Sequence, residues 1–467
     1  MFFKLKLLLQ ICIYALIVGI GCKIFYAPLR TPLPHPEEAP HLLTVAEKIE
    51  GLDFSVLPQA SCAKLLPFHQ CAGTFVKFIS TTHPNGYRLR TYRIFPAIFS
   101  VLFLLLLPAL GLRRRGGCFE TEDAPIWVAL LVLTTPPFLC YGSLFTPLSF
   151  QALLFLGLLV AFRAYVQWPG YLSTLFIALF IAMSLCIDAQ MAWVILLMIP
   201  AIALGVGWRR IRLYWHAQHF FVFTLVCLLS IALGVVFDFI TPPSLPSFGR
   251  VLNLSLSELA WRVIWLSAGG FGLVSWCALL FWSIYHPDRR WVKCFVTMYP
   301  LFLIASLGFE KGGAFAVPII CLSLLLSGMA LSTLPRLQFR IMLGGSAVAA
   351  LAVGMVQFLD QHFSDTLPPP QQRAAARELI IASKEKTDWR KVCLQIEDPI
   401  RAARVVWPIR QSRLLAKSDS AMADLLISDT PFEAENGLGT SATQSTLPLT
   451  QSTMIYLLQK NTSPKIL

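Results

Sequence analysis

The sequence predicts an all-α polytopic membrane protein with about eleven transmembrane helices, followed by a small external α/β domain at the C-terminus. Of its 467 residues, 56% are hydrophobic and 13% are charged, whereas soluble domains carry about 25% charged residues. The mean hydropathy is +0.66. After Thr366–Pro370 the composition becomes that of a soluble domain. The net charge of +13 gathers beside apolar runs, which indicates membrane topology rather than nucleic-acid binding.

The first span is predicted between Met1 and Tyr26. Lys4 and Lys6 precede the apolar run, and no small-residue cleavage site follows it. We therefore expect an uncleaved helix with a cytoplasmic N-terminus. Further apolar runs predict spans near residues 94–112, 125–142, 148–167, 170–187, 190–207, 219–240, 260–283, 294–309, 314–332 and 341–359.

Basic clusters test this count of spans. Each cluster follows an even-numbered span, so all of them share one side with Lys4 and Lys6 and satisfy the positive-inside rule. The C-terminus is then external, in the periplasm if the membrane is a bacterial inner membrane. The clusters are Arg113–Arg115, Arg163, Arg209 with Arg210 and Arg212, Arg289 with Arg290 and Lys293, and Arg336 with Arg340.

Two domains are expected. Residues 1–360 form the transmembrane domain, including a long polar external loop at 26–93, and residues 361–467 form the external domain. Within the latter, the pattern predicts a helix over 371–387 and a flexible Gly/Ser/Thr-rich loop over 432–452. Strand-like runs occupy 392–396, 403–409, 423–430 and 454–460.

The loop 26–93 carries the candidate chemistry. Glu37 and Glu38 lie just beyond the first span, followed by an amphipathic segment, residues 42–52, which can lie in the membrane interface. Two adjacent acids in a loop are usually only solvated. Alternatively, an acid at the membrane surface can deprotonate an acceptor hydroxyl or hold a divalent metal ion against a lipid phosphate. Apart from such a metal ion, no cofactor is expected.

Several basic residues lie on the predicted external side, where topology does not require them. Arg88, Arg90 and Arg93 precede the second span, and Lys311 lies in a short turn between two late spans. The arginines contact either ordinary headgroups or a specific lipid phosphate. Lys311 either pairs with Glu310 or snorkels, or it faces a lipid phosphate.

Cysteines give no metal-binding pattern. Most of the twelve lie in apolar runs, where they behave as small hydrophobic residues. Cys62 and Cys71 share the first loop and can pair if that loop faces an oxidising compartment.

The order of several short motifs resembles the GT-C membrane glycosyltransferases, in the branch of the dolichyl-phosphate-mannose–protein mannosyltransferases and lipid A aminoarabinose transferases. Glu37-Glu38 stands at the place of the family's acidic pair, and residues 64–68 (KLLPF) resemble its lysine box. Residues 92–96 (YRIFP) resemble the entry to the second span, residues 134–145 (TTPPFLCYGSLF) the third-span motif, and Lys311 with Pro318 a late Lys and Tyr-x-x-Pro motif.

The resemblance implies transfer of a sugar from a polyprenyl-phosphate donor to a lipid, glycan or protein acceptor on the external face. It makes Glu37 and Glu38 the candidate catalytic acids, with Glu37 also the candidate metal ligand. It makes Lys64, Arg93 and Lys311 the candidate donor-phosphate contacts. His69, Tyr141 and Asp188 are candidates for the acceptor site.

The chain departs from the family pattern near the third span. Ser143 replaces an expected arginine, Thr146-Pro147 and Ser149 stand where an acid is expected, and Asp188-Ala189 replaces a Lys-Gly pair. A second hypothesis is therefore an inactive relative that binds a lipid-linked sugar or scaffolds an envelope complex. A transporter ranks last, because no matching pair of Gly/Pro-broken spans occurs.

Overall fold

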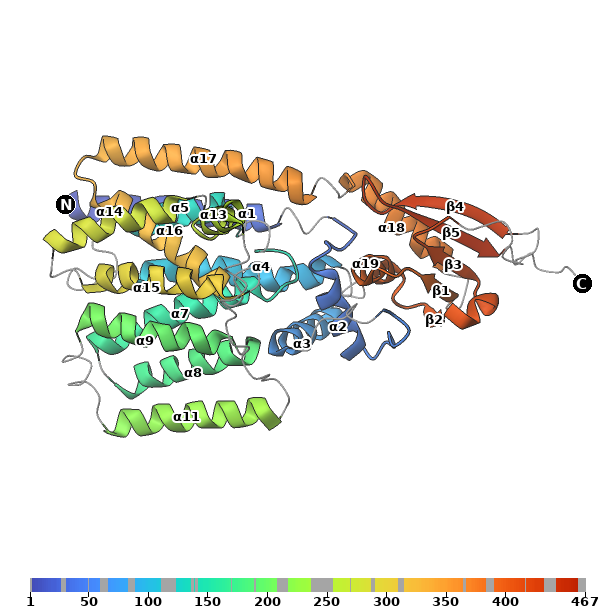
Figure 1. Ribbon diagram of the computed structural model, residues 1–467, viewed down its shortest axis with the longest axis horizontal. Helices are drawn as coiled ribbons and strands as arrows, with labels where there is room; N and C mark the ends of the chain where they lie inside the picture. Colours follow the sequence, from blue (N-terminus) through green and yellow to red (C-terminus); the bar gives the residue numbers. More distant parts are fainter. Residues whose placement is uncertain are drawn as a thin grey trace, which may run out of the picture. The chain divides into compact units, whose positions relative to one another are not determined.

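A computed structural model gives the fold of most of the chain (Figure 1). By its internal contacts the chain divides into two compact units. The helical unit comprises residues 1–25, 97–142 and 147–357, and the mixed unit comprises residues 26–96, 143–146 and 358–467. The described residues are 2–26, 31–48, 50–58, 66–82, 89–110, 123–135, 138, 142–168, 170–188, 190–207, 217–236, 255–268, 270–286, 290–309, 315–363, 367–383, 390–415, 417–431 and 442–460.

The helical unit is built from apolar helices, several of which run side by side in Figure 1. Its described elements are α1 (Phe2–Tyr26), α4 (Leu89–Leu106) with the 3-10 turn η2 (Leu107–Leu110), α5 (Ala124–Thr134), α7 (Leu148–Gln167), α8 (Tyr171–Ile187), α9 (Met191–Val206), α11 (Ala217–Val236), α13 (Leu256–Leu266), α14 (Phe271–Tyr285), α15 (Arg290–Leu307), α16 (Ala316–Thr333) and α17 (Leu337–Phe363). The unit boundaries fall within α1, α4 and α17.

Six of the described helices are long and apolar enough to cross a membrane. They lie in α1, α4, α7, α15, α16 and α17, and shorter apolar helices occur in α5, α8, α9, α11 and α14. The protein is an integral membrane protein. A helix lies at every predicted span, whereas the count of eleven crossings stays a prediction.

The predicted span 260–283 is wrong as a single helix. The structure breaks it into α13 and α14. At the break, Ala268 and Gly270 have positive φ values of 51° and 88°. A right-handed helix cannot continue through left-handed residues, and the apolar sequence alone did not reveal this change of backbone direction.

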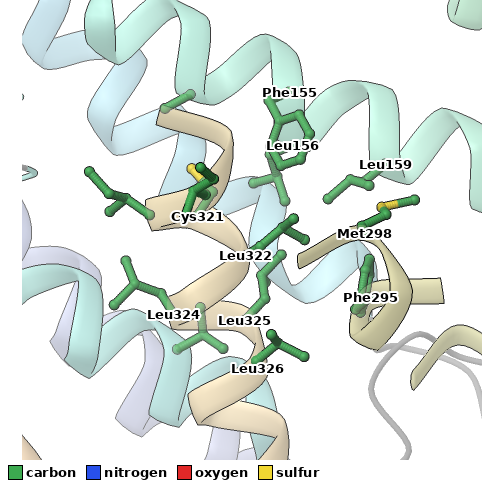
Figure 2. Close-up of a cluster of buried hydrophobic side chains, with 14 of the residues drawn as sticks. Phe155, Leu156, Leu159, Phe295, Met298, Cys321, Leu322, Leu324, Leu325 and Leu326 are labelled. Carbon is green, nitrogen blue, oxygen red and sulfur yellow. The ribbon is translucent and has the colours of Figure 1, made fainter. Parts of the chain in front are cut away.

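The core of the helical unit is a continuous apolar cluster (Figure 2). In the close-up, Phe155, Leu156 and Leu159 of α7 lie near Phe295 and Met298 of α15, and α16 beside them supplies the remaining labelled side chains. Because lipid is as apolar as these side chains, close packing rather than hydrophobicity selects the helix partners. The labelled α16 residues are Cys321, Leu322, Leu324, Leu325 and Leu326.

In the mixed unit, two short helices follow the first span. They are α2 (Ala39–Lys48) and α3 (Pro67–Thr82). The predicted amphipathic segment 42–52 forms the greater part of α2, but Leu42, Leu43 and Val45 are buried, and α2 packs against α3 and α19. Its apolar face is therefore covered by protein rather than by lipid.

The C-terminal part forms a mixed five-stranded sheet of order β2-β1-β3-β5-β4. Strands β2, β1 and β3 are parallel, and β5 is antiparallel to both β3 and β4. Side chains of α18 and α19 share one apolar core with one face of the sheet. The elements are α18 (Pro369–Ser383), β1 (Lys391–Gln395), α19 (Pro399–Ile409), β2 (Arg413–Leu415), the 3-10 turn η4 (Lys417–Met422), β3 (Leu425–Ser428), β4 (Ala442–Pro448) and β5 (Met454–Lys460).

Two local expectations for this part were wrong. Residues 403–409 form the end of α19 rather than a strand, because Asp398 caps the helix by accepting from the N–H groups of Ile400 and Arg401, and Pro399 follows. Part of the predicted loop 432–452 is strand β4, which pairs with β5 from Ala442 to Pro448. The polar composition of β4 gave no strand signal in the sequence. An edge strand pairs on one side only, so it can form from polar residues.

Gly205 provides a test of the helical core. A methyl group at Gly205 of α9 would lie 2.6 Å from the backbone nitrogen of Cys294 in α15, so one backbone would have to move. We expect Gly205→Ala to lower the free energy of unfolding by about 1–3 kcal/mol, measured by thermal unfolding in detergent. Gly19→Ala in α1 is the matched control, since nothing lies within 4 Å of its added methyl group. Equal stabilities of the two variants would contradict the close contact.

Candidate functional site

The N-terminus of α2 is fixed by a reciprocal contact between His35 and Glu38. The backbone N–H of His35 donates to Glu38 Oε1 at 2.7 Å, and the backbone N–H of Glu38 donates to the His35 carbonyl oxygen at 3.1 Å. The Glu38 side chain acts as the acid of a capping box does, by accepting from a backbone donor ahead of the helix, while the return bond goes to a backbone carbonyl. It turns the Glu38 carboxylate inward, against the start of its own helix.

Arg93 of α4 meets this carboxylate. Arg93 Nε donates to both carboxylate oxygens of Glu38, at 3.1 and 3.0 Å, and Arg93 Nη2 also donates to Oε1. The remaining donors reach the preceding chain segment, with Nη1 at 2.8 Å from the Thr31 carbonyl oxygen and Nη2 at 3.3 Å from that of Leu33. Glu38 is 0% and Arg93 1% exposed, so this ion pair is closed to solvent.

A third segment completes the enclosure of Glu38. The backbone N–H of Phe145 donates to Glu38 Oε2 at 3.1 Å. The Phe145 ring lies 5.1 Å from Phe68 and 5.5 Å from Tyr92 between ring centroids. Aromatic rings therefore exclude water from the carboxylate while backbone and guanidinium donors satisfy it.

The charge state of Glu38 follows from these contacts. Burial by itself raises the pKa of the Glu38 carboxyl, but the attraction of Arg93 and the hydrogen bonds from Arg93, His35 and Phe145 hold that pKa below its ordinary value. Glu38 is therefore a buried carboxylate that is saturated with donors. Such a group is poorly suited to removing a proton from a substrate.

Beside this pair, two histidines form a hydrogen-bonded chain. The backbone N–H of Leu66 donates to His69 Nδ1 at 2.9 Å, and His69 Nε2 lies 2.9 Å from His41 Nδ1. Because Nδ1 of His69 accepts, a neutral His69 carries its proton on Nε2 and donates it to His41. Nδ1 of His41 is then an acceptor, and the proton of His41 resides on its Nε2.

Burial keeps both rings neutral. It lowers the pKa of His41 to about 4, against the attraction of Glu38, which raises it. Burial and the neighbouring His41 lower the pKa of His69 to about 3. Since the folded pKa values lie below the unfolded value of about 6.5, the histidines stabilise the fold above that pH and progressively less below it.

Comparisons with known proteins can be set against this geometry. No protein-family model and no curated protein matches the sequence. Among solved structures, the chain is similar to ArnT from Cupriavidus metallidurans in the apo state, with a TM-score of 0.58 and 14% identity over 95% of this chain and 97% of that chain. ArnT bound to undecaprenyl phosphate gives a TM-score of 0.56 and 15% identity over the same shares.

A second solved protein has a similar fold. The cryo-EM structure of the arabinofuranosyltransferase AftD from Mycobacteria matches with a TM-score of 0.51 and 13% identity, over 96% of this chain and 40% of that chain. The chain has the GT-C fold. The motif order along the sequence predicted this fold, and the structures confirm it.

Within the GT-C fold of this chain, the predicted acids separate into two environments. Glu37 is exposed, whereas its neighbour Glu38 is fully buried against Arg93. The guanidinium of Arg93 donates to Glu38 and to the backbone of Thr31 and Leu33. The catalytic role of Glu37 and Glu38 and the phosphate contact of Arg93 stay predictions.

The other predicted residues fall in three places. His69 is buried, and both of its ring nitrogens contact protein atoms. Asp188 ends α8 in the helical unit, where it accepts from the N–H of Gln190 at 2.9 Å. Other residues named in the sequence analysis lie outside the described residues, among them Cys62, Lys64, Arg88, Tyr141 and Lys311. Arg90, also basic without a topological reason, contacts Tyr26 by its guanidinium, 4.8 Å above the ring.

Sequence reasoning missed His41 and the segment around Phe145. His41 follows Glu38 by three residues, which is a neighbouring position on a helix and was a usable signal. Phe145 contributes through its backbone N–H, which no side-chain motif reports. In the same segment, where the family's arginine and acid are replaced, the hydroxyl groups of Ser143 and Thr146 are buried and have no hydrogen-bond partner among the described residues.

The ion pair can be tested by removing each partner. We expect Glu38→Gln and Arg93→Met each to lower the protection free energy of α2 and the start of α4 by about 3–5 kcal/mol, because each leaves a buried charge alone. The double variant should cost less than the sum, since neither charge remains. Amide hydrogen exchange of the full chain in detergent measures this. Additive effects would contradict a coupled pair.

The histidine chain predicts an acid dependence. As pH falls from about 6.5 towards about 4, each histidine should remove about 1.4 kcal/mol of protection per pH unit from α2 and α3, because the unfolded chain binds a proton that the folded chain excludes. Hydrogen exchange across this range, corrected for intrinsic rates, measures it. A His41→Gln, His69→Gln double variant should flatten the dependence. An unchanged slope would show that other groups cause it.

Proposed function

We propose that the protein is a membrane glycosyltransferase that moves a sugar from a polyprenyl-phosphate donor to a lipid, glycan or protein acceptor on the external face. The observation that carries the proposal is the shared fold: the chain covers 97% of ArnT, which has been solved with undecaprenyl phosphate bound. AftD, an arabinofuranosyltransferase, shares the fold as well. The polar loop at 26–93 supplies Glu37 and most of the other candidate site residues.

Glu37 is the stronger candidate for the base. It is exposed, while Glu38 next to it is buried and fixed by Arg93 and Phe145. A rigid neighbour holds the backbone of Glu37 in place, and an exposed carboxylate can approach an acceptor hydroxyl. We therefore assign catalysis to Glu37 and positioning to the Glu38–Arg93 pair.

The proposed reaction is a single displacement. Glu37 takes the proton of the acceptor hydroxyl, and the acceptor oxygen forms a bond to the anomeric carbon from the face opposite the leaving group. The bond between that carbon and the donor phosphate oxygen breaks, and its electron pair leaves with the phosphate. Basic side chains stabilise the departing phosphate, with Lys64 and Lys311 as the candidates. The product has inverted configuration.

A metal ion is not needed for this scheme. Glu37 is the candidate ligand, but among the residues that the structure describes, no group of three or more His, Cys, Asp or Glu side chains is placed to hold a metal ion. The described surroundings of Glu37 do not fit a metal centre, and the reaction is therefore written without one.

The proposed orientation follows from charge. With the basic clusters retained in the cytoplasm, the N-terminus is cytoplasmic and the C-terminal sheet lies outside, in the periplasm of a bacterial cell. A polyprenyl-phosphate donor would then be used on the external side of the inner membrane.

The assignment of Glu37 predicts a large loss of turnover. Mass spectrometry of lipids and glycans in cells lacking the protein would first identify the missing sugar and acceptor. We expect Glu37→Gln to reduce the rate of sugar transfer in membranes at least about 100-fold, because a general base typically contributes that much. Glu47→Gln is the matched control, since Glu47 is an acid further along α2 that pairs with Lys48.

Full activity of Glu37→Gln would refute the assignment. Binding of a labelled polyprenyl-phosphate sugar without any transfer by the unaltered protein would refute the enzyme and favour an inactive lipid-sugar binder.

A further inference from the structure

The chain of hydrogen bonds through His69 ends at one ring nitrogen, Nε2 of His41. Each link points the same way, from the Leu66 N–H to His69 and from His69 to His41. The last N–H in the chain is that of His41 Nε2. Aligned donors polarise one another, which strengthens the terminal N–H as a donor.

His41 is the member of the pair that can meet a ligand. His69 is fully buried with both nitrogens occupied, whereas His41 is only partly buried. Among the described residues, none accepts a hydrogen bond from Nε2 of His41. A ligand contact in this part of the loop therefore belongs to His41 rather than to the predicted residue, His69.

The fixed proton position excludes two roles for His41. Nδ1 already accepts from His69, so it cannot bind a metal ion, and Nε2 carries the proton, so it cannot act as a base while the chain of bonds holds. His41 also cannot become a cation without losing the His69 bond. It is a neutral donor that does not change its charge.

The surroundings select an uncharged oxygen as its acceptor. The ionised carboxylate of Glu38 is close enough to raise the pKa of His41. The other titratable group that interacts with His41 is its hydrogen-bonding partner His69, which is neutral. Arg93 already balances the charge of Glu38, so a second anion would find no free cation in this pair, and a neutral donor offers it no charge in return for its lost hydration. A sugar hydroxyl accepts a hydrogen bond without this cost.

We propose that His41 is a saccharide-binding residue whose Nε2–H donates to a hydroxyl oxygen of the glycosyl group, with His69 as the residue that fixes the donor. This inference rests on the proposed function for the identity of its ligand, a polyprenyl-phosphate-linked sugar. The phosphate of that ligand is contacted elsewhere, by cationic side chains.

The first experiment needs no ligand. Nitrogen chemical shifts of the histidine-labelled full chain in detergent report which ring nitrogen carries the proton, and the His41 signal is identified by its loss in His41→Gln. We expect Nε2–H on His41 and no titration between about pH 5 and pH 8. In His69→Phe, which has no donor for Nδ1, His41 should gain a higher pKa, because nothing obliges Nδ1 to accept. A proton on Nδ1, or titration near pH 6.5 in the unaltered protein, overturns the proposal.

The second experiment compares two kinds of lipid in phosphatidylcholine nanodiscs. The probes are undecaprenyl phosphate and undecaprenyl phosphate carrying mannose or arabinose. We expect His41→Phe, which keeps the ring volume but not the donor, to weaken binding of a sugar-bearing lipid about tenfold and to leave undecaprenyl phosphate unchanged. His41→Gln keeps both an acceptor for His69 and a donor, and should restore most of the affinity.

Each other outcome counts against the inference. Equal weakening of both kinds of lipid would mean a phosphate contact or a folding defect, and unchanged binding would mean no contact. A failure of any sugar-bearing lipid to bind more tightly than undecaprenyl phosphate also overturns it. This experiment measures binding and not transfer, so the two proposals can fail separately. If the protein binds a sugar-bearing lipid through His41 but a transfer assay shows no turnover, the proposed enzyme is refuted and the His41 contact stands.

Discussion

The buried ion pair between Glu38 and Arg93 is the constraint on which the mixed unit depends. It joins the start of α2 to α4, and through shared donors it also holds the Thr31–Leu33 segment and the backbone of Phe145. An unpaired charge in this water-free position would be costly, so all these segments must be in place together. The ion pair therefore stabilises one arrangement of these segments over the alternatives.

The C-terminal sheet is tied to the same segment by α19. Arg404 donates to the Pro34 carbonyl oxygen at 2.9 Å, and the Trp407 ring meets Tyr92 edge-on with centroids 5.2 Å apart. Residues almost at the two ends of the sequence therefore form one compact unit. The expected domains placed the loop with the membrane helices, whereas the contacts place residues 26–96 with residues 358–467.

Adjacent acids received opposite environments because a helix start points neighbouring side chains in different directions. Glu38 turns inward to cap α2 and meet Arg93, and Glu37 is left at the surface. The same geometry brings His41 to His69, where tautomer and burial fix one proton. Hydrogen bonds therefore fix the buried polar groups around Glu38, which is a suitable setting for orienting a ligand.

The sequence by itself determined the membrane class, the places of the apolar helices and the GT-C fold. These properties follow from consecutive residues and from the order of short motifs, and the fold is shared with ArnT at 14% identity. Backbone direction and partner choice needed the tertiary structure. Left-handed residues at Ala268 and Gly270 split an apolar run, and a polar strand formed because β5 offered it an edge.

The same distinction applies to the candidate site. The sequence marked Glu37, Glu38, Arg93 and His69 as polar residues in an unusual loop. Only the packed chain decided which of them are buried, because Glu38 meets Arg93 across 55 residues and His69 meets His41 across 28. Burial and proton position are properties of the assembled surroundings, and no local pattern of residues encodes them.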